Sequence, residues 1–152
     1  MKFKKIVLLT GCTLALFGGL AHANIVISLP SGKSADVCDA LVGGWSGSGQ
    51  ITALGGLLVC NYSGTGSFAS AGSAGNYKVH VDLATSSGWP CANVSKDLNA
   101  ACGSGNLVVT SDDQSVNLTG TTDGKTVTIS KGTVAIDGVT ANVKYIDLSK
   151  TS

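Results

Sequence analysis

The chain of 152 residues contains no arginine and no glutamate: its ten basic residues are all lysine and its nine acidic residues are all aspartate. Helical bundles and coiled coils draw heavily on these two missing residue types, so their absence argues against such folds. The formal net charge is only +1, which excludes the basic surface of proteins that bind nucleic acids or anionic membranes. We therefore expect any partner to be recognised by something other than strong charge.

Aromatic residues are also scarce, whereas small residues are abundant. The aromatic residues after position 23 are Trp45, Tyr62, Phe68, Tyr77, Trp89 and Tyr145. Residues 24–152 include 18 Gly, 18 Ser and 12 Thr, a composition that favours tight turns and short strands. With so few large side chains, the core must consist of small and β-branched residues, and we expect disulfides to supplement it.

The first 23 residues are typical of a secretory signal peptide. Lysines at positions 2, 4 and 5 precede an apolar run from Ile6 to Leu20, and Ala21-His22-Ala23 fits the A-x-A cleavage motif. We predict a cleaved signal peptide over residues 1–23 and a single disulfide-stapled β-domain over residues 24–152. This domain carries 7 lysines and 9 aspartates, hence a net charge of −2. We expect it to be secreted or periplasmic in a Gram-negative bacterium.

A lipoprotein signal is the alternative interpretation of this segment. Leu9-Thr10-Gly11-Cys12 fits a lipobox, which would attach lipid to Cys12. However, only Ile6–Leu9 would then form the apolar signal core, and the chain stays apolar after Cys12 up to Leu20, where a lipoprotein carries a polar tether. Cleavage near Ala23 is therefore favoured over lipidation at Cys12.

Four cysteines remain after the signal peptide: Cys38, Cys60, Cys91 and Cys102. An even number in an exported domain predicts two disulfides, with three possible connectivities. We favour pairing between neighbours in the sequence, Cys38 with Cys60 and Cys91 with Cys102. Since no C-x-x-C motif is present and His80 is the only histidine after residue 23, the pattern does not indicate a metal site.

Alternating hydrophobicity predicts β-strands over most of the domain. Between Tyr77 and Leu83, apolar side chains alternate with polar ones, which is typical of a half-buried strand. Asp123-Gly124 and Asp137-Gly138 each separate two alternating runs, the strongest short-range signal for a hairpin. In the last run the apolar face changes phase near Lys144 or Tyr145, so we predict a β-bulge there.

Two short helices are expected between the strands. Ser34 precedes a helix predicted over residues 35–42, and a second helix is predicted over residues 95–101 with Ser95 as its cap. About eight short strands at regular spacing favour an all-β fold, a single antiparallel barrel or sandwich with one or two short helices and two disulfides.

The segment Leu41-Val42-Gly43-Gly44-Trp45 resembles the Gly-x-Trp start of the first strand in lipocalins and avidins. The resemblance implies a barrel in which Trp45 is the anchor that closes one end. Neither family's pattern is complete: the lipocalin barrel-closing arginine is missing, and of the further avidin tryptophans only Trp89 offers a counterpart.

No residue pattern indicates catalysis, and we expect no cofactor. None of the many serines lies in a G-x-S-x-G elbow. His80 falls on the polar face of its predicted strand, where a solvated position is expected. Asp112 and Asp113 are the densest acidic cluster, and a hairpin turn is favoured there over a calcium site.

We therefore predict a non-catalytic binding domain for an extracellular or surface partner, a carbohydrate or a protein. Trp89, beside Pro90 and Cys91, is the main candidate for an exposed aromatic anchor, and Tyr62 and Tyr77 are further candidates. One alternative is a lipocalin-like barrel that carries a small apolar ligand. A second alternative is a hydrolase with an aspartate-based site.

Overall fold

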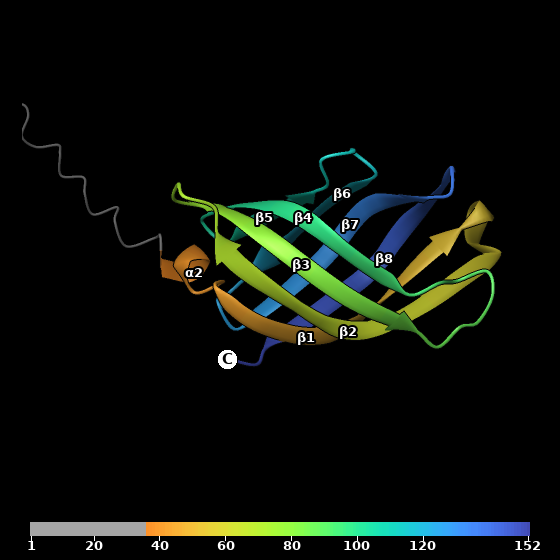
Figure 1. Ribbon diagram of the computed structural model, residues 1–152, viewed down its shortest axis with the longest axis horizontal. Coiled ribbons are helices and arrows are strands. Elements are labelled where there is room, and N and C mark those ends of the chain that lie inside the picture. The colour runs from red at the N-terminus through yellow and green to blue at the C-terminus, as the bar shows by residue number, and fades with distance from the viewer. Residues whose placement is uncertain (1–35) are drawn as a thin grey trace, which may run out of the picture. The chain divides into compact units, whose positions relative to one another are not determined.

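The computed structural model describes residues 36–152, which form a closed antiparallel β-barrel of eight strands (Figure 1). Each strand pairs with the next along the chain, and β8 pairs back on β1. The all-β prediction is confirmed, and of the two predicted architectures the barrel is the one that forms. The predicted signal peptide over residues 1–23, with Cys12, lies outside the described residues.

The strands alternate in direction and are joined by short connections. They are β1 (Gly43–Ala53), β2 (Leu58–Ser70), β3 (Asn76–Thr85), β4 (Val94–Gly103), β5 (Asn106–Thr110), β6 (Val116–Thr122), β7 (Thr126–Ile136) and β8 (Val139–Lys150). A short helix, α2 (Asp36–Asp39), precedes β1, and a 3-10 turn, η3 (Leu54–Gly56), joins β1 to β2. No helix in the described part of the chain is long and apolar enough to cross a membrane.

The three local features predicted from turn residues and phase are confirmed. Asp123-Gly124 joins β6 to β7, and Asp137-Gly138 joins β7 to β8. The pairing of β1 with β8 shifts register at Lys144, because Gln50 lies opposite Tyr145 and the next residue, Ile51, lies opposite Val143. Lys144 is thus the extra residue of a bulge, and this explains why the apolar face changes phase along β8.

The predicted helices are only partly correct. The first is limited to α2, four residues long, which ends well before residue 42. The prediction over residues 95–101 is wrong, since these residues belong to β4. In β4 the side chains of Val94, Leu98 and Ala100 face inward in alternation with polar residues. Burial of this alternate row against the core therefore outweighs the helical preference of the segment.

The predicted disulfide pairing is also wrong: the bonds join Cys38 to Cys102 and Cys60 to Cys91. Cys91 precedes β4 and Cys102 lies at the far end of that strand, so most of its ten residues separate the two cysteines. Ten extended residues span roughly 33 Å, far beyond the distance that a disulfide bridges. Only a helix over residues 95–101 would have shortened that span. The error in pairing therefore follows from the error in secondary structure.

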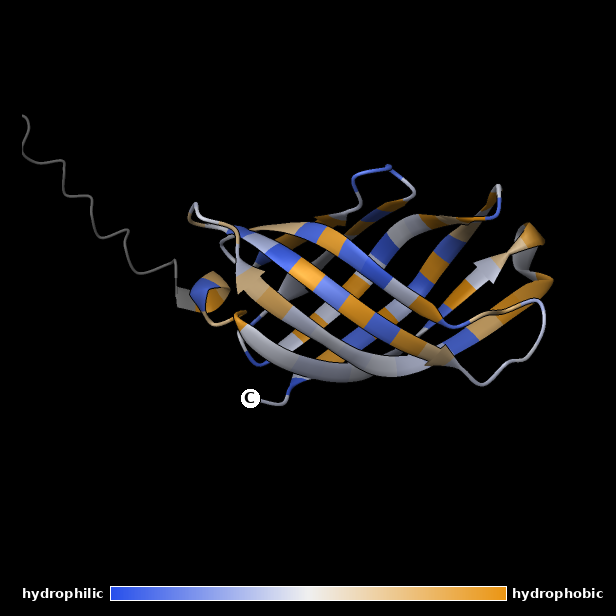
Figure 2. Cartoon of the chain, viewed as in Figure 1, coloured by the Kyte–Doolittle hydropathy of each residue, from blue (hydrophilic) through white to orange (hydrophobic). Residues whose placement is uncertain are grey.

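Polar and apolar side chains alternate along the strands, so the barrel has a polar outside and an apolar inside (Figure 2). On β3, Tyr77 and Val79 are buried while Lys78 and His80 are exposed. The abundant serines and threonines lie mainly on outward positions, as Thr119 and Thr128 do. Burial of the inward row drives strand association, at about 25 cal/mol per Å² of apolar surface removed from water.

One end of the barrel, which we call the closed end, is covered by α2 and the segment that follows it (Figure 1). Leu41 and Trp45 fill the interior there, with 0% and 1% of their surface exposed. Trp45 Nε1 donates to the Leu41 carbonyl at 2.8 Å, and its ring lies edge-on to Phe68, 5.9 Å between centroids. The chain lacks the arginine of the lipocalin pattern, and the cation over the Trp45 ring is Lys150, 5.6 Å from the centroid.

Three interactions fasten α2 to the closed end. The Cys38–Cys102 disulfide ties the helix to the end of β4. Tyr77 donates its hydroxyl to the Cys38 carbonyl at 2.6 Å. Lys150 Nζ donates to the carbonyls of Ala40 and Val42, the latter at 2.8 Å. These two carbonyls belong to the segment after α2, so the bonds fix the connection between the helix and β1.

Glycines allow neighbouring strands to approach closely in the middle of the wall. A Cβ on Gly47 would lie 2.0 Å from the Asp147 carbonyl oxygen of β8, and a Cβ on Gly64 would lie 2.0 Å from the Asp82 oxygen of β3. Real Cβ atoms do not approach oxygens so closely, so a side chain at either position would push two strands apart.

We predict that Gly47→Ala destabilises the protein by about 1–3 kcal/mol or more, because the added methyl group collides with backbone that cannot yield. The matched control is Gly103→Ala, where no atom lies within 4 Å of the added Cβ, and its free energy of unfolding should change by less than about 0.5 kcal/mol. Urea denaturation measures both. Equal effects of the two substitutions would contradict the close-approach explanation.

Candidate functional site

The barrel interior holds a cavity of about 410 Å³ with a predominantly apolar lining. Every strand except β5 contributes to it. The apolar side chains that line it are Ile51, Tyr62, Val81, Leu83, Val94, Leu98, Val116, Leu118, Val134, Ile136, Ile146 and Leu148. A volume of this size and an apolar lining are typical of small-molecule binding pockets.

The cavity exists because large side chains are concentrated at the closed end. We call residues 36–45, from α2 to Trp45, the plug of the closed end. Along β1 the inward positions run from Trp45 to Gly47 and Gly49, so the wall loses its side chains just beyond the plug. Gly47 and Gly49 both line the cavity. Ile146, the neighbour of Gly49 on β8, packs against the core but stays partly exposed, and so does Val81 on β3. These side chains face an interior that the protein itself leaves unfilled.

The cavity opens through the side of the barrel, where one hairpin is short. β5 has 5 residues and β6 has 7, whereas the flanking β4 and β7 have 10 and 11. β5 pairs with β4 only from Asn99 onward, and β6 pairs with β7 only as far as Val134. Beyond the β5–β6 turn, on the side away from α2, the wall is therefore incomplete (Figure 1). We call this gap the side opening; it is lined by Val94–Lys96, Ser115 and Ala135–Asp137.

Lys96 forms the polar edge of the side opening. Its Nζ lies 2.9 Å from Asp113 Oδ2 and 2.8 Å from Ser115 Oγ. Asp113 also accepts hydrogen bonds from the Ser111 hydroxyl and from the Ser115 amide and hydroxyl. These hydrogen bonds hold the pKa of Asp113 well below its usual value, and the bond from Ser111 contributes most to this lowering. The acidic pair of residues 112 and 113 thus forms the predicted turn, fixed by its own hydrogen bonds.

A second space of about 300 Å³ lies at the open end of the barrel, opposite the plug. Tyr62, Val94 and Ile136 line both this space and the cavity, so the two are neighbours. The connection between β3 and β4, residues 86–93, forms part of its border, with Pro90 and Cys91 in the lining.

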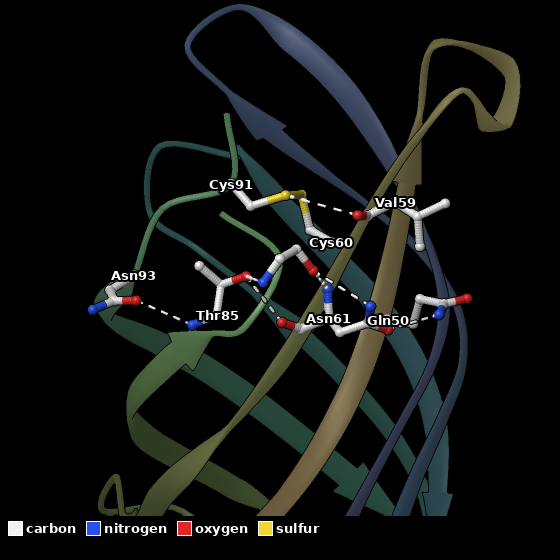
Figure 3. Close-up of a disulfide and its surroundings, with 8 residues drawn as sticks. Gln50, Val59, Cys60, Asn61, Thr85, Cys91 and Asn93 are labelled. Carbon is white, nitrogen blue, oxygen red and sulfur yellow. Dashed lines mark hydrogen bonds between the residues drawn. A yellow bond between two sulfur atoms is a disulfide. The ribbon is translucent and has the colours of Figure 1, made fainter. Parts of the chain in front are cut away.

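The 86–93 loop is held in place by the second disulfide and a hydrogen-bond network (Figure 3). Cys91 is bonded to Cys60 on β2. The Ser87 hydroxyl accepts from the Asn61 amide at 2.8 Å, and the Thr85 amide donates to the Asn93 side chain at 3.0 Å. A loop fixed in this way needs little further ordering when it meets a partner.

Large apolar side chains project from the loops of the open end into solvent. Trp89 is 94% exposed and Leu57 is 90% exposed, and Leu54 is exposed by 62%. Trp89 is therefore an exposed aromatic side chain on a fixed loop, in a cis peptide with Pro90.

The two tyrosines are not exposed, contrary to the expectation that placed them with Trp89. Tyr62 is 8% exposed and lines the cavity, and burial raises its pKa. Tyr77 is 4% exposed and bonded to α2, so it belongs to the closed end. Burial, followed by the nearby charge of Asp39, raises the pKa of Tyr77. The structure thus separates the three aromatic candidates.

His80 lies on the outer surface between two carboxylates. Its Nδ1 is 2.7 Å from Asp97 and its Nε2 is 3.2 Å from Asp82. The hydrogen bond with Asp97 is the main cause that raises the pKa of His80 above 6.5, and Asp82 adds to it. Across residues 36–152, no three His, Cys or Asp side chains gather in a way that would hold a metal ion.

Sequence reasoning missed Lys96 and the apolar rows that line the cavity. Lys96 has the same strand phase as Val94 and Leu98, which places a cation among inward positions. Alternation alone could have shown this, but the segment was interpreted as a helix. The cavity itself depends on which inward rows face one another after closure, and only the register of all eight strands determines that.

Comparisons with known proteins return no match: no family model fits the sequence, and neither a curated protein nor a solved structure aligns with the chain. The geometry of the barrel is therefore the guide to its function.

The surroundings of His80 predict a pH dependence of stability. Because its pKa is raised in the folded state, the stabilisation is fully present below the ordinary value near 6.5 and is lost as the pH rises through the raised value. The imidazole pKa, measured by NMR titration, should exceed 6.5. Asp97→Asn should lower it, whereas Asp147→Asn, on β8, should not. An unshifted imidazole in the unmodified protein would contradict the pairing.

Proposed function

We propose that the protein is a non-catalytic carrier that binds a small apolar ligand inside its barrel. The observation that carries the proposal is the apolar cavity of about 410 Å³, closed at the Trp45 end and open at the side. Inward apolar side chains such as Val81 and Ile146 remain partly exposed in it. A ligand that covered them would gain the hydrophobic free energy that the empty barrel leaves unused.

The rigidity of the site supports this role. Hydrogen-bonded strands form the cavity walls, and a disulfide at each end holds the plug and the 86–93 loop. A preformed pocket of this kind binds with a small entropic penalty. The two disulfides also support an oxidising compartment, so we place the carrier outside the cytoplasm, secreted or periplasmic, after removal of residues 1–23.

The carrier function predicts that a larger side chain in the cavity blocks binding. Val81→Phe, on the inward face of β3, should weaken binding of an uncharged naphthylamine dye by about tenfold or more, since a loss of 1.4 kcal/mol corresponds to tenfold. Its melting temperature should stay the same or rise, because the new ring fills empty space. Dye fluorescence titration and thermal denaturation measure the two effects.

The matched control is Val108→Phe, because Val108 is 41% exposed and points away from the barrel interior. It should bind the dye as the unmodified protein does. Native mass spectrometry of the purified protein should in addition show a bound small molecule that Val81→Phe loses. Equal dye affinity of the two variants would overturn the carrier function.

A second function, recognition of a carbohydrate or protein at the surface, is favoured by Trp89. Its indole is 94% exposed on a loop fixed by the Cys60–Cys91 disulfide. Exposed, fixed aromatic side chains are frequent anchors of binding interfaces because they lose little conformational entropy on contact.

The exposure of Trp89 predicts a contrast with the other tryptophan. Trp89→Ala should change the free energy of unfolding by less than about 0.5 kcal/mol and should remove the indole fluorescence that acrylamide quenches. Trp45→Ala should instead cost about 3–5 kcal/mol, because it empties the closed end. A large loss of stability on Trp89→Ala would assign that ring to the core and contradict its role as an anchor.

A further inference from the structure

Among residues 36–152, Lys96 is the one cationic side chain that lines the cavity. It occupies an inward position on β4, between Val94 and Leu98. An ammonium group cannot remain in an apolar interior without a partner, so the aliphatic stem follows the wall while the charged end reaches the side opening. The side chain is 33% exposed there. Lys96 thus joins the apolar cavity to a polar edge.

The ammonium has hydrogen-bonding capacity beyond its partners in the protein. It carries three N–H donors, and within residues 36–152 its acceptors are Asp113 Oδ2 and Ser115 Oγ. The third donor is available to an acceptor atom that enters the side opening. A ligand with one oxygen at its end would accept the third hydrogen bond of Lys96 while its apolar part stayed inside the cavity.

The charges around the opening select among such oxygens. Asp113 already neutralises Lys96, and Asp137 at the end of β7 is a further carboxylate in the cavity lining, whereas Asp112 is hydrogen-bonded to Asn99 and does not line the cavity. Two carboxylates therefore share the opening with one ammonium, which leaves a net charge of −1 there. A carboxylate or phosphate head group would be repelled at close range, whereas an uncharged oxygen would not.

We propose that the ligand is an uncharged amphiphile, such as a long-chain alcohol or ester, whose oxygen accepts a hydrogen bond from Lys96 at the side opening while its apolar body fills the barrel. This inference rests on the carrier function proposed above and adds the chemical class of the ligand. An alkylammonium head group has no acceptor atom for the Lys96 hydrogen bond, so it is also disfavoured.

The test compares three probes with the same hydrocarbon chain: dodecanol, dodecanoate and dodecylammonium. Each displaces the uncharged naphthylamine dye from the full-length protein at neutral pH. Dodecanol should bind about tenfold more tightly than either ion, as expected for a difference of about 1.4 kcal/mol. Dodecanoate or dodecylammonium binding as tightly as dodecanol would overturn the proposal.

Two substitutions assign the selectivity to named groups. Lys96→Met should weaken dodecanol several-fold and leave the dye unchanged, while Lys131→Met, on the exposed face of β7, should change neither. Asp137→Asn should narrow the preference for dodecanol over dodecanoate. Residue 137 has a φ of 48°, a backbone conformation that asparagine tolerates well, so this variant should fold. An unchanged preference in both Lys96→Met and Asp137→Asn would overturn the proposal.

The outcomes separate this inference from the carrier function. If the dye does not bind, or binds equally to Val81→Phe, the carrier function is wrong. If the dye binds and Val81→Phe blocks it, but the three head groups bind alike, only the assignment of the ligand class is wrong.

Discussion

An eight-stranded barrel has an interior just wide enough for side chains to fill, and this chain fills only one end of it. Trp45, Phe68 and Tyr77 meet in edge-to-face contacts at the closed end. The next inward positions on β1 are Gly47 and Gly49, which add nothing to the interior. An inward row that passes from tryptophan to glycine within four residues cannot fill a barrel evenly. The cavity is a direct consequence of this uneven distribution.

The two disulfides compensate for the core that is missing. Cys38–Cys102 holds the plug at the closed end, and Cys60–Cys91 holds the 86–93 loop at the open end. Each closes a long loop and is worth about 4 kcal/mol on the chain-entropy model. Neither disulfide crosses the cavity. Stability is thus supplied at the two ends, and the space between them stays free for a ligand.

Local sequence patterns correctly predicted the turns and the bulge, which depend on residues close together in the sequence. The Asp123-Gly124 and Asp137-Gly138 turns and the bulge near Lys144 all follow from a few consecutive side chains. The prediction of the disulfide pairing was wrong because it assumed a helix over residues 95–101. These residues instead belong to the extended strand β4, which holds Cys91 and Cys102 far apart.

The site was harder to predict than the fold. Trp89 is exposed, as its loop composition indicated, whereas Tyr62 lines the cavity and Tyr77 supports the plug. Local alternation places all three aromatic residues on strands or loops but does not distinguish the filled part of the interior from the empty part. That distinction depends on the pairing register of all eight strands, which the sequence of a single segment does not determine.

The inward position of Lys96 is possible only because the barrel wall has the side opening. In a sealed apolar barrel an inward lysine would be strongly destabilising, because its charge would lose water without gaining a partner. The short β5–β6 hairpin removes that cost, since its turn supplies Asp113 and Ser115 as acceptors at the level where the lysine emerges. A hairpin as long as its neighbours would close the wall over Lys96 and bury the ion pair. An inward cation and a shortened hairpin that supplies its partners therefore make the side opening a built-in feature of this barrel, with a polar edge beside an apolar interior.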